Sequence, residues 1–241
     1  MTKNNTPALP CERPKVICFD ADDTLWHNEE YYQEAEQRFC ELLSDYGAKQ
    51  DLFSALFAQE MQNMDLLGYG SKAFTISMIE AALKLTQDQL PISLLKQLIA
   101  LGKENIAPPM VLFPQAETCL QQLRPHFRLA LATKGDLRDQ ERKLERSGLA
   151  HYFEDVFIVS EKDTKAYQKI IHRLGISTAE FMMVGNSFKS DILPVLAIGG
   201  RAVYIPSAVL WLHEQVEITE HPDLHTLTRL DQLPEYVNTL G

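Results

Sequence analysis

Residues 16–24 of the chain read VICFDADDT, and this stretch decides the fold and places the candidate site. Its first four residues are continuously apolar and rich in side chains that favour strands, which is typical of a central parallel strand buried on both faces. Three carboxylates, Asp20, Asp22 and Asp23, follow that strand directly. Because open α/β sheets bind their ligands beyond the carboxyl ends of the strands, we expect the site at this cluster.

Residues 28–109 show helical patterns and no strand pattern. Asn28 is a candidate N-cap, Glu29 and Glu30 suit the dipole of the first turn, and Gly47 ends the first apolar run. Apolar side chains then recur at helical spacing. The further predicted helices cover residues 52–64, 73–85 and 92–101.

Strands and helices alternate in the rest of the chain, which predicts a parallel sheet covered on both faces. The predicted strands cover residues 128–133, 156–160, 181–185 and 201–205. The predicted helices cover residues 116–123, 136–147 and 164–174. We therefore predict an α/β fold. A Rossmann-like parallel sheet core is built from residues 14–27 and 110–241, with an inserted all-helical cap domain at 28–109 and an N-terminal tail at 1–13.

Composition limits the possible partners. The net charge of −10 repels a nucleic-acid backbone on average, so we expect no nucleic-acid partner. The four cysteines show no zinc-site spacing and suit a reducing compartment. The first residues lack the apolar run of a signal peptide, and no window reaches the roughly 18 apolar residues that span a bilayer. We expect a cytoplasmic protein without a membrane partner.

Polar side chains gather at the predicted strand ends. They are Asp20 and Asp22 after the first strand, Thr133 at the end of the second, Lys162 in the loop after the third, and Asn186 with Asp191 after the fourth. Carboxylates, a hydroxyl and a lysine together fit a hard cation and an anionic substrate. Oxygen ligands favour Mg²⁺ over zinc.

Four short motifs make the chain resemble the haloacid dehalogenase superfamily, and within it the phosphatases with a helical cap. They are FDADDT at residues 19–24, LATKG at 131–135, SEKD at 160–163 and VGNSFKSD at 184–191. The first motif alone is a weak signal. Four motifs in order, each at the right element, are hard to obtain by chance.

The resemblance implies roles for the first two carboxylates. Asp20 resembles the nucleophile that attacks phosphorus and forms an aspartyl-phosphate, and a carboxylate of ordinary pKa is already ionised at neutral pH. Asp22 resembles the general acid/base that protonates the leaving alcohol and later activates water. That role requires a raised pKa, which neighbouring carboxylates can supply.

The resemblance also implies how a phosphoryl group is bound. Thr133 resembles the hydroxyl that contacts the transferring group, and Lys162 the lysine that neutralises the nucleophile and the phosphoryl oxygens. We prefer Lys162 to Lys165 because its spacing to the aromatic Tyr167 is better. The implied cofactor is Mg²⁺, held by Asp20, the backbone carbonyl of Asp22, Asn186 and Asp191.

Two positions depart from the family pattern. Asn186 stands where an aspartate is frequent, so this ligand contributes no charge. Lys134 stands where asparagine is common, and it either contacts the substrate or only adds to the positive field. Residues 68–72 form a polar break between helices, which is either a specificity loop or a flexible connection.

The expected function is a Mg²⁺-dependent phosphatase for a small phosphorylated metabolite. A phosphomutase on the same fold would keep all four motifs and stays an alternative. A non-catalytic phosphate-binding relative is the second alternative, favoured only by Asn186. The motifs do not determine the substrate or the oligomeric state, because specificity depends on cap residues that vary while the motifs do not.

Overall fold

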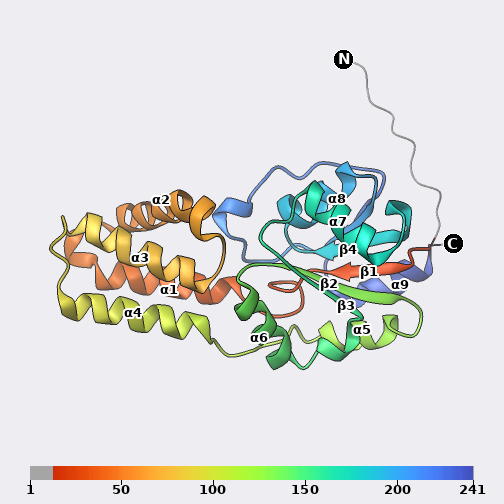
Figure 1. Cartoon of the computed structure of the whole chain (residues 1–241), viewed down its shortest axis with the longest axis horizontal. Coiled ribbons are helices and arrows are strands. Elements are labelled where there is room, and N and C mark those ends of the chain that lie inside the picture. Colours follow the sequence, from red (N-terminus) through yellow and green to blue (C-terminus); the bar gives the residue numbers. More distant parts are fainter. Residues whose placement is uncertain (1–12, 241) are drawn as a thin grey trace, which may run out of the picture. The chain divides into compact units, whose positions relative to one another are not determined.

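The structure is a computed structural model, and it describes residues 13–240. Most of the predicted N-terminal tail, residues 1–13, and Cys11 lie outside the described residues. Six parallel strands form one sheet in the described part of the chain, in the order β3-β2-β1-β4-β5-β6 (Figure 1). The strands are β1 (Val16–Phe19), β2 (Arg128–Lys134), β3 (Asp155–Val159), β4 (Phe181–Gly185), β5 (Arg201–Tyr204) and β6 (Leu224–Thr226). The predicted α/β fold with a Rossmann-like sheet is confirmed.

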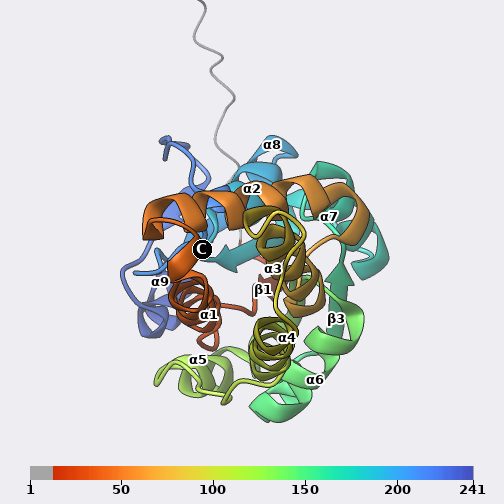
Figure 2. The ribbon, with the colours of Figure 1, turned by 90° about the vertical axis from the view of Figure 1, so that its left-hand side faces the viewer.

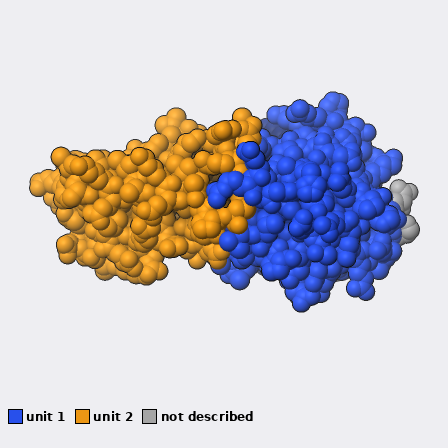
Figure 3. Space-filling model, turned by 90° about the horizontal axis from the view of Figure 1, so that it is seen from below, with its two compact units in different colours: residues 1–27, 111–134, 144–241 blue, residues 28–110, 135–143 orange. Residues whose placement is uncertain are grey.

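The chain separates into two compact units (Figure 3). The first comprises residues 1–27, 111–134 and 144–241, of which 1–12 and 241 are not described. The second comprises residues 28–110 and 135–143. The sequence-based boundaries assigned residues 135–143 to the core because they fall within its alternation of strands and helices, and residues 138–143 were interpreted as a solvated helix face. In the structure their charges bind the helical unit: Lys72 Nζ lies 2.9 Å from Asp136 Oδ1, and Arg142 donates to the Ile106 carbonyl over 2.6 Å.

The first unit carries the sheet between two layers of helices (Figure 1). Its helices are α5 (Ala116–Leu123), α7 (Thr164–Leu174), α8 (Leu193–Ala197) and α9 (Leu233–Asn238). Single helical turns lie at η2 (Ala150–Tyr152), η3 (Thr178–Glu180), η4 (Phe188–Ile192), η5 (Leu212–Glu214) and η6 (Leu230–Gln232). Helix α6 (Leu137–Ser147) begins in the second unit and ends in the first.

Strand β1 is buried on both faces, as its continuous apolar run predicts. Cys18 packs with Ala130, Met183 and side chains of α7 and α8 in one core cluster. Because successive side chains of a strand alternate, Ile17 points to the opposite face, where α5 and α9 lie (Figure 1). Because β1 is buried on both faces, its position is fixed. The position of Asp20, which follows it directly, is fixed as well.

The second unit is helical. It contains α1 (Glu29–Leu42), η1 (Ser44–Tyr46), α2 (Lys49–Leu67), α3 (Ser71–Leu85) and α4 (Ile92–Ile106). Figure 2 shows α1, α3 and α4 nearly end on, with α2 crossing them. A shared apolar core that includes Phe39, Leu52, Met78 and Leu98 holds the four helices together.

Asn28 occupies the predicted N-cap position of α1, and Glu29 and Glu30 lie in the first turn as expected, but the expected side-chain cap does not form. The Asn28 side chain makes no capping hydrogen bond and instead accepts one from Lys143 Nζ over 2.7 Å. A charged donor outcompetes the backbone amides for this acceptor. The break at residues 68–72 contains Gly68 and Gly70, both with positive φ, and α3 begins at Ser71 directly after it.

Candidate active site

The polar residues expected at the strand ends come together at the carboxyl ends of β1, β2 and β4. Phe19 pairs with Leu131 of β2 and Val184 of β4, and the Asp20 amide donates to the Val184 carbonyl over 2.8 Å. Asp20 therefore emerges between the two neighbouring strands. Thr133, within β2, is 2% exposed. The parallel register places these residues at one edge of the sheet.

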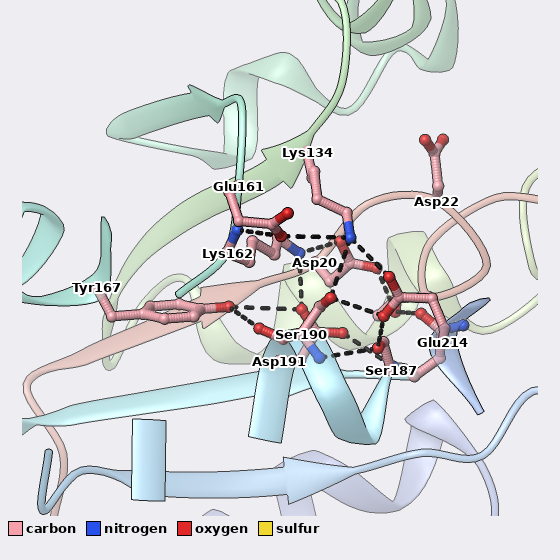
Figure 4. A network of polar contacts seen from close by, with 12 residues as sticks. Asp20, Asp22, Lys134, Glu161, Lys162, Tyr167, Ser187, Ser190, Asp191 and Glu214 are labelled. Carbon is pink, nitrogen blue, oxygen red and sulfur yellow. Dashed lines mark hydrogen bonds and ion pairs between the residues drawn. The ribbon is translucent and has the colours of Figure 1, made fainter. Parts of the chain in front are cut away.

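Asp20, Lys162 and Asp191 form a buried charged group (Figure 4). Lys162 Nζ donates to Asp20 Oδ1 and, over 2.7 Å, to Asp191 Oδ1. These three residues are 1–6% exposed. Tyr167 OH donates to the Ser190 carbonyl over 3.1 Å and lies 3.5 Å from Asp191 Oδ1. Lys165 is exposed, so the structure brings Lys162 and not Lys165 to Asp20.

The surroundings of Asp20 and Lys162 shift the pKa values of both residues. The pKa of Asp20 is raised to about 7, because burial and the neighbouring Asp191 raise it by more than Lys162 lowers it. Burial by itself lowers the pKa of Lys162, but Asp191 and Asp20 outweigh burial and raise the pKa above its ordinary value. Burial therefore disfavours the ionised form of Asp20, and Lys162 favours it. Its carboxylate form depends on the neighbouring positive charge.

Asp22 lies outside this group (Figure 4). Its Oδ1 accepts a hydrogen bond from Trp26 Nε1 over 2.7 Å. Asp23 has φ 60°, and its amide donates to the Trp26 carbonyl over 2.8 Å. Thr24 closes the turn with a hydrogen bond to Asp20 Oδ2 over 3.0 Å. The side chains of Asp20 and Asp22 therefore point in different directions from the turn after β1.

The atoms around the Asn186 amide indicate whether a cation fits beside Asp20. One terminal atom of this amide lies 3.1 Å from Asp20 Oδ2 and 3.2 Å from the carbonyl oxygen of Asp22. As nitrogen, that atom donates to both oxygens. As oxygen, it accepts from Thr24 Oγ1 over 3.1 Å and completes a group of three oxygens, from a carboxylate, a carbonyl and an amide, which are ligand types that hard cations take. The donor set fits a hard cation such as Mg²⁺.

Asp191 stands beside this oxygen group. Its Oδ2 accepts from the Ser187 amide over 3.0 Å. A Cβ at Gly185 would lie 2.2 Å from Asp191 Oδ2, so only glycine leaves room for this carboxylate. Among residues 13–240, no three His, Cys, Asp or Glu side chains surround a common metal position. Any cation here therefore depends on backbone, amide and water oxygens besides the two carboxylates.

Lys134 contacts Glu214, a residue that sequence reasoning missed. Lys134 Nζ donates to Glu214 Oε1 over 2.7 Å and to Ser190 Oγ over 3.0 Å. Burial alone would raise the pKa of Glu214, but Lys134 and the hydroxyls of Ser187 and Ser190 lower it to about 2. No motif marks Glu214, because it lies in the irregular segment between β5 and β6. Tyr167, which the sequence reasoning used only to choose Lys162, lies on the first turn of α7.

Comparisons with known proteins agree with this geometry. The sequence model of the haloacid dehalogenase-like hydrolase family matches residues 14–199. A crystal structure of a haloacid dehalogenase-like family hydrolase from Xanthomonas campestris superposes with a TM-score of 0.86 at 34% identity, covering 95% of this chain and 92% of that one.

Two curated relatives are phosphatases by name. The glyceraldehyde 3-phosphate phosphatase of Methanopyrus kandleri is 27% identical over 74% of this chain and 78% of its own. The N-acylneuraminate-9-phosphatase of Mus musculus is 29% identical over 52% of this chain and 51% of its own. Within the described residues, no helix is both long enough and apolar enough to cross a membrane.

Proposed function

The chain belongs to the haloacid dehalogenase-like hydrolase family, and from this premise we propose that it is a Mg²⁺-dependent phosphatase that acts through an aspartyl-phosphate on Asp20. The observation that carries the proposal is the buried contact of Asp20 with Lys162, beside the oxygen group of Asp20, Asp22 and Asn186. A nucleophilic carboxylate, a cation for phosphoryl oxygens and a site for a metal lie together there. The names of the two curated relatives add support for phosphate monoesters.

The proposed first step transfers the phosphoryl group to Asp20. An Asp20 carboxylate oxygen forms a bond to phosphorus, and the bond between phosphorus and the ester oxygen breaks. Asp22 gives its proton to the leaving alkoxide, so an alcohol departs. Lys162 offsets the negative charge that gathers on the phosphoryl oxygens, and the Thr133 hydroxyl donates to one of them.

The proposed second step releases phosphate. Asp22, now a carboxylate, takes a proton from water, and the water oxygen attacks phosphorus. The bond between phosphorus and Asp20 breaks, which regenerates the free carboxylate and inorganic phosphate. Burial of Lys162 and Asp20 strengthens the charge interactions in both steps, since little water screens them.

Mg²⁺ would be held by Asp20, the carbonyl of Asp22, Asn186 and Asp191. When bound, it neutralises phosphoryl oxygens and orients the substrate. Asp191 has one oxygen on Lys162 and the other on the Ser187 amide, so its carboxylate is held in place beside the Mg²⁺ that it would help to bind. Asn186 would contribute its amide oxygen, which accepts from Thr24 Oγ1 over 3.1 Å.

We propose a small phosphorylated metabolite as the substrate and the cytoplasm as the location. The net charge of −10 disfavours a nucleic-acid phosphate and leaves small anions possible at the Lys162 site. Cys18, Cys40 and Cys119 are buried free thiols, which suits a reducing compartment.

Phosphate release from a chromogenic aryl phosphate tests the proposal, with Mg²⁺ and with a chelator. We expect Mg²⁺-dependent turnover that falls at least about 10³-fold in Asp20→Asn, because a covalent nucleophile is removed. Asp23→Asn is the matched control. It removes a neighbouring charge at a positive φ that asparagine tolerates, and it should keep near-normal turnover. Normal turnover of Asp20→Asn would reject the mechanism.

A screen of sugar phosphates, phosphoglycolate and nucleoside monophosphates separates the alternatives. A phosphatase releases inorganic phosphate from its substrate. A phosphomutase isomerises a hexose phosphate without net release. A non-catalytic relative shows no metal-dependent release from any of these compounds or from the aryl phosphate.

A further inference from the structure

Glu214 is a buried carboxylate that joins three parts of the chain (Figure 4). It is 7% exposed and lies on η5, within the irregular segment between β5 and β6. Its Oε1 accepts from Lys134 Nζ over 2.7 Å, and its Oε2 accepts from Ser190 Oγ over 2.6 Å and from Ser187 Oγ. One carboxylate therefore takes hydrogen bonds from the end of β2 and from the turn after β4.

The turn after β4 carries the proposed metal ligands. Asn186 precedes Ser187, and Asp191 follows Ser190. The turn is closed by hydrogen bonds from the Ser190 amide to Ser187 Oγ over 3.0 Å and from the Asp191 amide to the Ser187 carbonyl over 2.8 Å. Because Glu214 accepts from both serine hydroxyls, it fixes the outer side of the turn while Lys162 holds the inner side.

The contact with Lys134 has an electrostatic consequence. Lys134 Nζ touches Ser190 Oγ, so its positive charge lies against the turn that would hold a cation. Glu214 cancels that charge directly. Glu161 lies 3.6 Å from the same ammonium, but its side chain is 51% exposed, so solvent screens it. Without Glu214, a poorly compensated ammonium would repel a cation at the neighbouring ligands.

The segment that carries Glu214 is itself anchored to the turn. Lys189 Nζ donates to the His213 carbonyl over 2.9 Å and lies 3.0 Å from His213 Nε2. η5 is thus held on η4 at two successive residues. This attachment gives Glu214 a fixed position even though its segment contains little regular structure.

We propose that Glu214 is a positioning residue for the metal site. It anchors the turn that carries Asn186 and Asp191, and it neutralises Lys134 so that the site keeps its affinity for Mg²⁺. This inference rests on the proposed function because it concerns the same Mg²⁺. It also changes the role expected for Lys134. The Lys134 ammonium binds Glu214 and the turn after β4, and it does not bind the substrate.

Calorimetric titration of metal-free protein with Mg²⁺, without substrate, tests the inference. Glu214→Gln keeps an oxygen for the two serines but turns an amide toward Lys134. We expect the Mg²⁺ dissociation constant to rise about 10-fold or more, the usual effect of removing a partner that orients metal ligands. Glu217→Gln is the matched control, because it removes an exposed charge from the same segment, and it should change the constant by less than about twofold.

A double variant separates this role from general destabilisation. Lys134→Met combined with Glu214→Gln removes both charges and leaves no uncompensated ammonium. We expect its Mg²⁺ dissociation constant to return to within about threefold of the wild-type value, since contacting residues are not additive. If Glu214→Gln alone does not fold, the double variant carries the test by the same criterion.

Three results overturn the inference. They are wild-type affinity in Glu214→Gln, a double variant at least tenfold weaker than wild type (about 1.4 kcal/mol), and a wild-type protein that binds no Mg²⁺. Phosphate release is measured separately on the same preparation. A wild-type protein that binds Mg²⁺ but hydrolyses no phosphate rejects the proposed phosphatase, and the comparison of dissociation constants still decides the role of Glu214.

Discussion

Trp26 Nε1 donates a hydrogen bond to Asp22 Oδ1 over 2.7 Å, and the Trp26 side chain is only 1% exposed. This contact holds the proposed acid/base carboxylate in one direction, apart from the group of Asp20 and Lys162. The buried Trp26 indole thereby fixes the orientation of Asp22.

Trp26→Phe should therefore impair proton transfer selectively. Phenylalanine keeps most of the buried ring and removes the donor, so Asp22 loses its orientation. We expect formation of the aspartyl-phosphate from an alkyl phosphate to slow about tenfold, because hydrogen bonds to charged groups contribute about 1.5–3 kcal/mol, while its formation from an aryl phosphate changes little. Asp22→Asn should show the same selectivity more strongly. Equal losses for the two leaving groups in this first step, with no trapped aspartyl-phosphate, would count against proton transfer by Asp22.

Asn186→Asp should strengthen Mg²⁺ binding. The amide atom that lies 3.1 Å from Asp20 Oδ2 would be replaced by a carboxylate oxygen, which adds charge without changing shape. We expect the Mg²⁺ dissociation constant to fall about tenfold, since charge-assisted contacts are roughly twice as strong as neutral ones. Turnover need not rise, because added negative charge repels the substrate phosphate.

The same titration of Asn238→Asp is the control for this prediction, because Asn238 is exposed on α9. Unchanged or weaker binding in Asn186→Asp would place Asn186 outside the coordination of the metal.

Glu36 of α1 should make the stability of the helical unit depend on pH. Burial raises the pKa of Glu36 from 4.5 to about 7. A carboxyl with a higher pKa in the folded state stabilises the fold below its unfolded pKa, and the contribution is lost as pH rises through its folded pKa. Glu36→Gln should therefore be more stable than wild type by about 1–2 kcal/mol near pH 8 and nearly equal near pH 4.

Urea unfolding at both pH values measures this difference, with Glu34→Gln as the control on the same helix. Glu34 is exposed, so its variant should show no such pH dependence. A Glu36→Gln protein that is less stable than wild type near pH 8 would contradict a destabilising buried charge.

Strands buried on both faces gave the clearest sequence patterns. β1 and β4 lie in the middle of the sheet, and their continuous apolar runs record that burial. β6 has three residues, LHT, at the edge of the sheet, and it was not predicted. An edge strand this short depends on its neighbour β5 and leaves no pattern of its own.

The same distinction applies to the residues of the site. Asp20, Thr133 and Asn186 were predictable because each lies at or directly after a buried strand, so the register of the sheet fixes its place. Glu214 was not, because its position depends on tertiary contacts of an irregular segment. The Asn28 side chain was expected from local sequence to cap α1, but its oxygen accepts a hydrogen bond from Lys143, which is distant in the sequence.

The central claim is that Asp20 accepts the phosphoryl group. The most direct test mixes Asp22→Asn with an aryl phosphate and Mg²⁺ and quenches the reaction in acid during the first turnover. This variant should form the aspartyl-phosphate from a good leaving group and hydrolyse it slowly, so the intermediate accumulates. Mass spectrometry of the intact protein and its peptides then locates the group. The account predicts one phosphoryl group, on the peptide that contains Asp20, and none when Asp20→Asn is added. Phosphate release without a phosphorylated enzyme, or a phosphoryl group on another residue, would contradict it.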